Sequence, residues 1–334
     1  MKEKLLFFSI KHPLLYILSL AIIVKFMAAI FTNGSITSAV DFNYYKIPEL
    51  WFSSPWIVYS SRLILGAFSL LIITLAYRIT KIIADKTTAL EIAVFAAFLW
   101  NMPYASVHPI STMIAIPFML YGTLLILKQH SLLNNNEIEK FHRTTFIIAG
   151  FFLGLGFAVC FQSLIYYIGI VLTLFILKNW KGALMSFIGY VIAVGITQSV
   201  VDLVIYHRPF VAMTEFFRTP LFTGINGSLT INFIIFWLIP PMSLMLLFGF
   251  FRVLRKYILL VLPALITLLC SVFMYDIEFL MMIMPTYLIA GYVGWKEFHK
   301  NSAFWTNNKW LLLTCYIIFA LLNTAMIVFT FIYL

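Results

Sequence analysis

Long apolar runs separated by short polar connections fill most of this 334-residue chain. A helix that crosses a bilayer needs roughly 20 consecutive, mostly apolar residues, because the hydrocarbon core is about 30 Å thick. About eleven such helices would use about 220 residues, which leaves no room for a separate soluble domain. We therefore predict an all-α, polytopic transmembrane bundle with spans at 13–32, 57–77, 88–104, 110–127, 145–161, 163–177, 183–205, 230–250, 258–274, 279–295 and 310–333.

The composition agrees with a membrane protein. Hydrophobic residues make up 63% of the chain and charged residues 10%, whereas soluble domains are about half apolar and a quarter charged. The formal net charge of +10 is split into short basic groups between the apolar runs, so nucleic acid is not an expected partner. The three cysteines all lie inside apolar runs and the carboxylates are dispersed, so we expect neither a disulfide framework nor a metal site or other cofactor.

The distribution of basic residues predicts the orientation. With the N-terminus in the cytoplasm, 17 of the 22 Lys and Arg residues fall on the cytoplasmic side, as the positive-inside rule requires. The C-terminus then lies outside, and a bacterial-type cytoplasmic (inner) membrane is the expected location of this integral, multi-pass protein. The 17 residues are Lys2, Lys4, Lys11, Arg78, Lys81, Lys86, Lys128, Lys140, Arg143, Lys178, Lys181, Arg252, Arg255, Lys256, Lys296, Lys300 and Lys309.

The longer polar segments lie on the predicted outer side, so we expect the functional residues there. Its two main loops are 33–56 and 206–229, and acidic residues gather in or near these and other outer segments. Within the apolar runs ionisable residues are scarce, with Lys25 the clear case, and the sequence has no internal repeat. Both observations argue against an ion-coupled transporter built from inverted halves.

The first part of the chain has a familiar order of features. A short N-terminus and one span lead into an outer loop with an early acid, Asp41, and then to Arg62 at the mouth of the second span. This order resembles the membrane glycosyltransferases of the GT-C fold, which use polyprenyl-phosphate-linked sugars as donors. The stretch 60–128 is also similar to that superfamily in its succession of arginine, helix, basic turn and helical hairpin.

Three later stretches resemble more narrowly the Alg9/PIG-B-like mannosyltransferases (GT22-like). The residues that match are Gln162 in the first stretch, Asp202, Tyr206 and Arg208 in the second, and Glu278, Phe279 and Pro285 in the third. The stretches themselves read FIIAGFFLGLGFAVCFQSLIYY, VVDLVIYHRPF and MYDIEFLMMIMPTYLIAGY.

The resemblance implies a single membrane domain over 1–334. Its catalytic N-terminal part is 1–128 with the outer loop 33–56, and the remaining spans occupy 129–334 with the outer loop 206–229. It also implies the transfer of a hexose, such as mannose, from a polyprenyl-phosphate carrier to an envelope glycan, lipid or protein acceptor. Membrane lipids, and partner proteins in the membrane, complete the expected partners.

Such a transfer needs a carboxylate to accept the proton of the acceptor hydroxyl and cations to stabilise the departing lipid phosphate. We expect Asp41 to be the general base, and Arg208, assisted by Arg62 or Arg218, to hold the phosphate. The further candidates for substrate binding are Asp202, His108 and Glu278.

Structural roles remain open for several of these residues. Asp41 could pair with Arg62 or Lys25, Asp202 could form a salt bridge with Arg208, and His108 could be a polar residue of the membrane interface. Lys25 could extend outward along its long stem or pair with an acid from another helix.

Two other functions also stay open. One is a catalytically inactive subunit or scaffold of a membrane complex, because Phe42 stands where the family has a second acid and the segment 276–278 lacks its basic neighbours. The other is a lipid or solute transporter.

Overall fold

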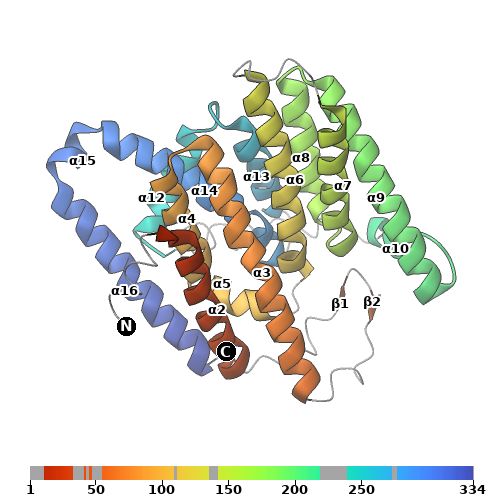
Figure 1. Ribbon diagram of the computed structural model, residues 1–334, viewed down its shortest axis with the longest axis horizontal. Coiled ribbons are helices and arrows are strands. Elements are labelled where there is room, and N and C mark those ends of the chain that lie inside the picture. Colours follow the sequence, from red (N-terminus) through yellow and green to blue (C-terminus); the bar gives the residue numbers. More distant parts are fainter. Residues whose placement is uncertain are drawn as a thin grey trace.

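The protein folds into a bundle of helices (Figure 1). The computed structural model describes residues 11–32, 41–42, 45–46, 55–108, 111–134, 142–218, 239–272 and 277–333. Its helices are α2 (Pro13–Phe31), α3 (Pro55–Ile83), α4 (Lys86–Phe98), α5 (Asn101–Val107), α6 (Ser111–Asn134), α7 (Arg143–Val159), α8 (Ser163–Ile176), α9 (Trp180–Tyr206), α10 (Val211–Arg218), α12 (Met242–Arg252), α13 (Ile258–Ser271), α14 (Ile277–Asn301), α15 (Ala303–Asn307) and α16 (Lys309–Tyr333). Within these ranges the strands are β1 (Asp41–Phe42) and β2 (Tyr45–Lys46), a two-stranded antiparallel hairpin.

Several helices are long and apolar enough to cross a bilayer. Five meet this condition by themselves, in α2, α3, α6, α9 and α16, and α4 and α5 meet it together as a bent pair. Four shorter helices, α7, α8, α12 and α13, are also apolar. The predicted class, a helical integral membrane protein, is confirmed, while the count of eleven spans stays a prediction.

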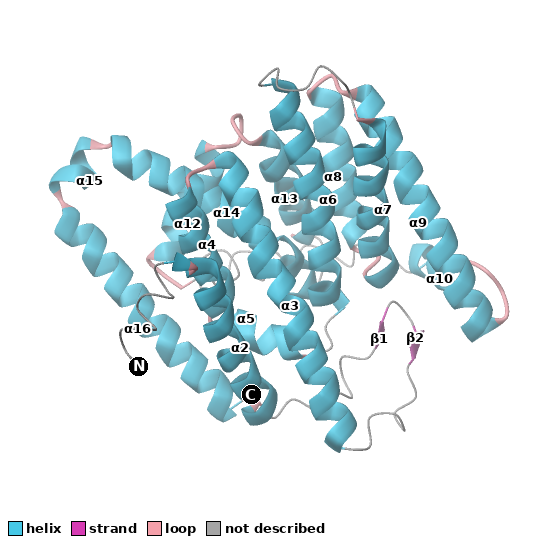
Figure 2. Cartoon of the chain, in the orientation of Figure 1, coloured by secondary structure: helices cyan, strands magenta, loops and turns pink. Residues whose placement is uncertain are grey.

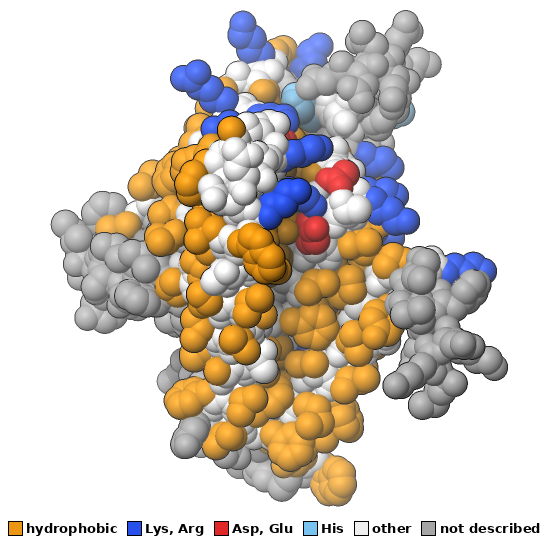
Figure 3. Space-filling view, turned by 90° about the vertical axis from the view of Figure 1, so that its left-hand side faces the viewer, with side chains coloured by type: hydrophobic (Ala, Val, Ile, Leu, Met, Phe, Trp, Pro, Cys, Tyr) orange, Lys and Arg blue, Asp and Glu red, His pale blue; other side chains and the backbone are white. Residues whose placement is uncertain are grey.

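The two ends of the bundle differ in charge. The connections α3–α4, α8–α9 and α12–α13 lie at the upper end of the view in Figures 1 and 2, which we call the basic end. In Figure 3 the Lys and Arg side chains gather toward that end, above a broad hydrophobic surface. The β1–β2 hairpin, α5 and α10 lie toward the opposite end (Figure 1). The orientation of the bundle in the membrane stays a prediction.

Glycines bring the backbones of α7 and α9 into contact. A Cβ atom on Gly150 would lie 1.8 Å from the carbonyl oxygen of Ser186, and one on Gly189 would lie 1.9 Å from that of Ile147. Lipid tails are as apolar as side chains, so helices in a bilayer associate through such close packing rather than through the hydrophobic effect. The pair α12–α14 uses the same device, since a Cβ on Gly249 would lie 2.0 Å from the carbonyl oxygen of Gly291.

The span predicted at 88–104 is not one continuous helix. Its two parts, α4 and α5, meet at an angle of 61°. Leu99 has extended backbone angles (φ −61°, ψ 128°) and ends α4. Pro103 favours this break, because a proline has no N–H to donate to the carbonyl four residues earlier and its ring clashes there. That earlier carbonyl belongs to Leu99, the residue at which the helix stops.

We predict that Gly189→Ala lowers the thermal stability of the protein in lipid nanodiscs. The added methyl group would force α7 and α9 apart, at a cost of about 1–3 kcal/mol. The matched control is Gly195→Ala on the same helix, where an added Cβ has no neighbour within 4 Å. Alanine favours a helix over glycine by about 1 kcal/mol, so this control should melt at the same temperature or higher. Equal melting temperatures for the two variants would contradict the close-packing argument.

Candidate functional site

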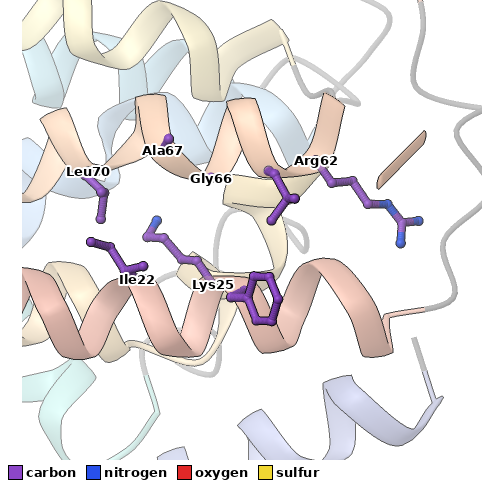
Figure 4. Close-up of a pocket in the computed structure, with 8 residues that line it drawn as sticks. Ile22, Lys25, Arg62, Gly66, Ala67 and Leu70 are labelled. Carbon is purple, nitrogen blue, oxygen red and sulfur yellow. The ribbon is translucent and has the colours of Figure 1, made fainter. Parts of the chain in front are cut away.

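A groove runs between α2 and α3 (Figure 4). It has a volume of about 190 Å³. Its rim is apolar, and the side chains of Ile22, Phe26 and Leu63 are about half exposed at the surface that faces lipid in a membrane. The full lining consists of Ile22, Lys25 and Phe26 from α2 and of Arg62, Leu63, Gly66, Ala67 and Leu70 from α3.

Lys25 is one of two buried basic residues of the groove, with an exposed fraction of only 5%. Its Nζ donates to Ser69 Oγ over 2.5 Å, and Ser69 Oγ donates in turn to the carbonyl oxygen of Gly66 over 2.7 Å. Lys25 therefore joins α2 to α3 through a hydroxyl group. The side chain of Lys25 therefore does not extend to the surface. Among the described residues, its hydrogen-bond partner is a hydroxyl group and not a carboxylate.

Arg62 ties the start of α3 to the end of α2. It is 4% exposed, and its Nη1 donates to the carbonyl oxygens of Thr32 over 2.8 Å and Ala29 over 3.3 Å. The last carbonyls of a helix lack intrahelical partners and carry partial negative charge, so a guanidinium is well placed there.

The two cations of the groove do not converge on one point. In Figure 4 Lys25 extends between the helices, whereas Arg62 leaves α3 in the opposite direction, beyond the end of the groove. The lysine contacts Ser69, which lies seven positions after Arg62, or about 10 Å along a helix. A single phosphate therefore cannot contact both groups. We call the end of the groove at Arg62 its mouth, and Lys25 lies farther along the groove.

His108 ends α5 and lies near Arg62. It is 6% exposed, its Nδ1 donates to the carbonyl oxygen of Tyr104 over 2.8 Å, and its ring stacks on that of Tyr104 at 4.1 Å between centroids. Burial lowers the pKa of His108; the bond to Tyr104 opposes this shift and the charge of Arg62 adds to it. The neutral imidazole, protonated on Nδ1, is therefore favoured. Its buried Nε2 has no hydrogen-bond partner among the described residues.

A second group of the sequence-predicted residues lies at α9 and α10. Asp202 is fully buried, and its Oδ2 accepts a hydrogen bond of 3.1 Å from the backbone N–H of Ala212, in the first turn of α10. Arg208 is exposed, and Arg218 forms an exposed ion pair of 3.1 Å with Glu215. Asp202 therefore caps a helix, which is a structural role.

The structure thus brings together Arg62 and His108. It places Asp202 on α9, Arg208 in the connection between α9 and α10, and Arg218 on α10. The backbone of Asp41 lies in β1, opposite Lys46, while its side chain and that of Glu278 lie outside the described residues. No cluster of three or more His, Cys, Asp or Glu side chains that could hold a metal ion occurs in the described ranges.

Sequence reasoning missed two partners of this site. Tyr104 precedes His108 by four positions, which is the helical spacing that places two side chains on one face, and this signal could have been used. Ser69 lies 44 positions after Lys25, and nothing in the sequence links the two.

No protein-family model matches the chain, and no curated protein matches its sequence significantly. Its function is therefore argued from its residues and their arrangement.

We predict that the protein becomes less stable as the pH is lowered below 6.5, and that His108 causes part of this loss. Because burial lowers the folded-state pKa of His108 below the ordinary value of 6.5, the unfolded chain takes up the proton first. The contribution of the neutral ring is therefore complete above pH 6.5 and is lost as the pH falls toward the lower folded-state pKa. In melting curves from pH 7.5 to 5, His108→Gln should lose less stability than the wild type, and the exposed-residue control His207→Asn should follow the wild type. Parallel curves for wild type and His108→Gln would contradict the burial argument.

A second prediction separates the two roles of Asp202. We expect Asp202→Ala to destabilise the protein by about 0.5–2 kcal/mol through loss of the cap on α10, whereas Asp202→Asn keeps an oxygen acceptor and stays near the wild type. Thermal melting measures both. If Asp202→Asn is folded and stable but inactive in the assay described below, the purely structural role is wrong.

Proposed function

We propose that this protein is a membrane glycosyltransferase that moves a hexose from a polyprenyl-phosphate carrier to a glycan, lipid or protein acceptor. The observation that carries the proposal is the groove between α2 and α3, which is apolar, open at its side toward lipid, and ends at the buried guanidinium of Arg62. A carrier lipid needs an arrangement of this kind, with apolar walls for its chain and a cation for its phosphate.

In the proposed complex the chain of the carrier lies along Ile22, Phe26 and Leu63. The phosphate lies at the mouth of the groove, where the charge of Arg62 stabilises the negative charge that develops as the sugar leaves. Arginine suits this task because its planar fork can donate two hydrogen bonds to phosphate. The neutral Nε2 of His108 supplies an acceptor beside Arg62 that can hold a sugar hydroxyl.

The proposed reaction is a direct displacement. The acceptor hydroxyl oxygen bonds to the anomeric carbon, the bond from that carbon to the phosphate oxygen breaks, and its electron pair stays on the phosphate. The hydroxyl proton passes to the carboxylate of Asp41, the general base. The β1–β2 hairpin that carries Asp41 lies toward the same end of the bundle as α5, which supports this assignment (Figure 1).

The proposal includes the predicted topology. Eleven spans, an N-terminus in the cytoplasm and a C-terminus outside would place the basic end inside a bacterial-type inner membrane and the mouth of the groove at the outer face. The gathering of Lys and Arg at one end of the bundle supports this orientation (Figure 3).

A non-catalytic subunit or scaffold is the second candidate. Two observations favour it: Nη1 of Arg62 is bound to backbone carbonyls, and Asp202 caps a helix. Both groups therefore have structural roles that an inactive relative of the fold would retain.

The test is transfer by the purified chain in nanodiscs, with labelled polyprenyl-phosphate hexoses as donors and membrane extracts as acceptors. We expect Asp41→Asn to lose at least about 100-fold in rate with unchanged expression, because loss of a general base costs 10²–10⁴-fold. The matched control is Glu215→Gln, which removes another acid whose ion pair is exposed and contributes little.

Two results would contradict the proposal in different ways. Activity retained in Asp41→Asn would reject Asp41 as the base. Absence of transfer by the wild type from every donor tested would favour the scaffold.

A further inference from the structure

The break between α4 and α5 interrupts the hydrogen-bond pattern of a regular helix. In a continuous helix the carbonyl oxygen of Phe98 would accept a hydrogen bond from the N–H of Met102. That N–H donates instead to the carbonyl oxygen of Leu99, over 2.8 Å. The N–H of Trp100 lies in the same break, between the last residue of α4 and the first residue of α5. Inside a bilayer no water can satisfy such groups, so the protein itself must do so.

A single side chain of α16 satisfies both groups. Asn323 Nδ2 donates to the carbonyl oxygen of Phe98 over 2.8 Å, and Asn323 Oδ1 accepts from the N–H of Trp100 over 2.9 Å. The residue is 9% exposed, although most of α16 is exposed. One turn earlier, Phe319 is buried and its ring lies 5.5 Å from that of Phe95 on α4. These two adjacent contacts fix α16 at the break.

The direction of α5 decides where His108 lies. Val107, the last residue of α5, packs with Ala28 and Ala29 of α2. It also lies beside α3, since a Cβ on Gly66 would be 3.5 Å from Val107 Cγ1. His108 follows directly, beside Arg62. A change in the bend between α4 and α5 would therefore move His108 away from the mouth of the groove.

We propose that Asn323 is a positioning residue, which holds the bend between α4 and α5 and thereby sets His108 against Arg62. Its effect on catalysis rests on the proposed function, whereas its effect on α5 does not. The amide is suited to the task because it offers one donor and one acceptor at once. Leucine offers neither, and aspartate only accepts.

The test measures the position of α5 directly. In a chain whose three cysteines are replaced by alanine, Ala29→Cys and Val107→Cys place two thiols in one packed cluster, and copper phenanthroline oxidises them to a disulfide. We expect Asn323→Leu to lower the yield of this cross-link at least threefold, and Asn323→Asp to lower it less. The matched control is Thr324→Val, the next residue on α16, whose exposed hydroxyl bonds only to its own helix.

A spectroscopic readout accompanies the cross-link. The groups that act on His108 are Arg62 of α3 and Tyr104 of α5, and Arg62 in turn interacts with Tyr59 of α3. When α5 moves, His108 gains solvent, and its NMR titration midpoint should rise toward 6.5 in Asn323→Leu but not in Thr324→Val. If Asn323→Leu does not fold, Asn323→Asp is measured in its place.

The outcomes are separable. A folded Asn323→Leu with the wild-type cross-link yield and His108 titration would overturn the positioning role. If both readouts change while the wild type shows no transfer from any donor, Asn323 positions α5 as proposed and the glycosyltransferase function fails.

Discussion

Inside a bilayer, every backbone polar group must form its hydrogen bonds within the protein, and this requirement determines how α4, α5 and α16 are arranged. A membrane helix can be interrupted only where other groups replace its lost hydrogen bonds. At the α4–α5 break this replacement comes from Asn323, which contacts the carbonyl of Phe98 and the N–H of Trp100 from a helix more than 200 positions away. The bend is therefore a property of two distant segments, and α5 takes its direction from α16.

Polar side chains join neighbouring segments elsewhere in the structure as well. Arg62 satisfies carbonyls at the end of α2, Nζ of Lys25 donates to Ser69, and Asp202 caps α10. Each group therefore combines a charge with a structural contact in apolar surroundings. The consequence for function is that the charges near the groove have fixed positions, which favours their use in binding a charged ligand over their use as mobile groups.

Pairs of helices in this bundle differ in how closely they pack. Helices that lack a hydrophobic drive to associate need close backbone approach, which the glycines of α7, α9, α12 and α14 provide. Between α2 and α3, by contrast, a groove remains, and Lys25 and Arg62 are the basic residues among its mostly apolar lining. In the proposed function this groove is the place where the carrier lipid binds.

The sequence by itself determined the membrane class, the places of most helices and the gathering of basic residues at one end, because the bilayer imposes a minimum apolar length and a charge rule that act on each segment locally. It also singled out Arg62 and His108, but not their proximity, and it predicted one straight span where the chain bends. Only the tertiary structure decided the bend, the hydroxyl partner of Lys25 and the capping role of Asp202. Each of these depends on a hydrogen bond between segments that are distant in sequence or on a turn between helices. The local pattern of apolar residues does not indicate which segments form such hydrogen bonds.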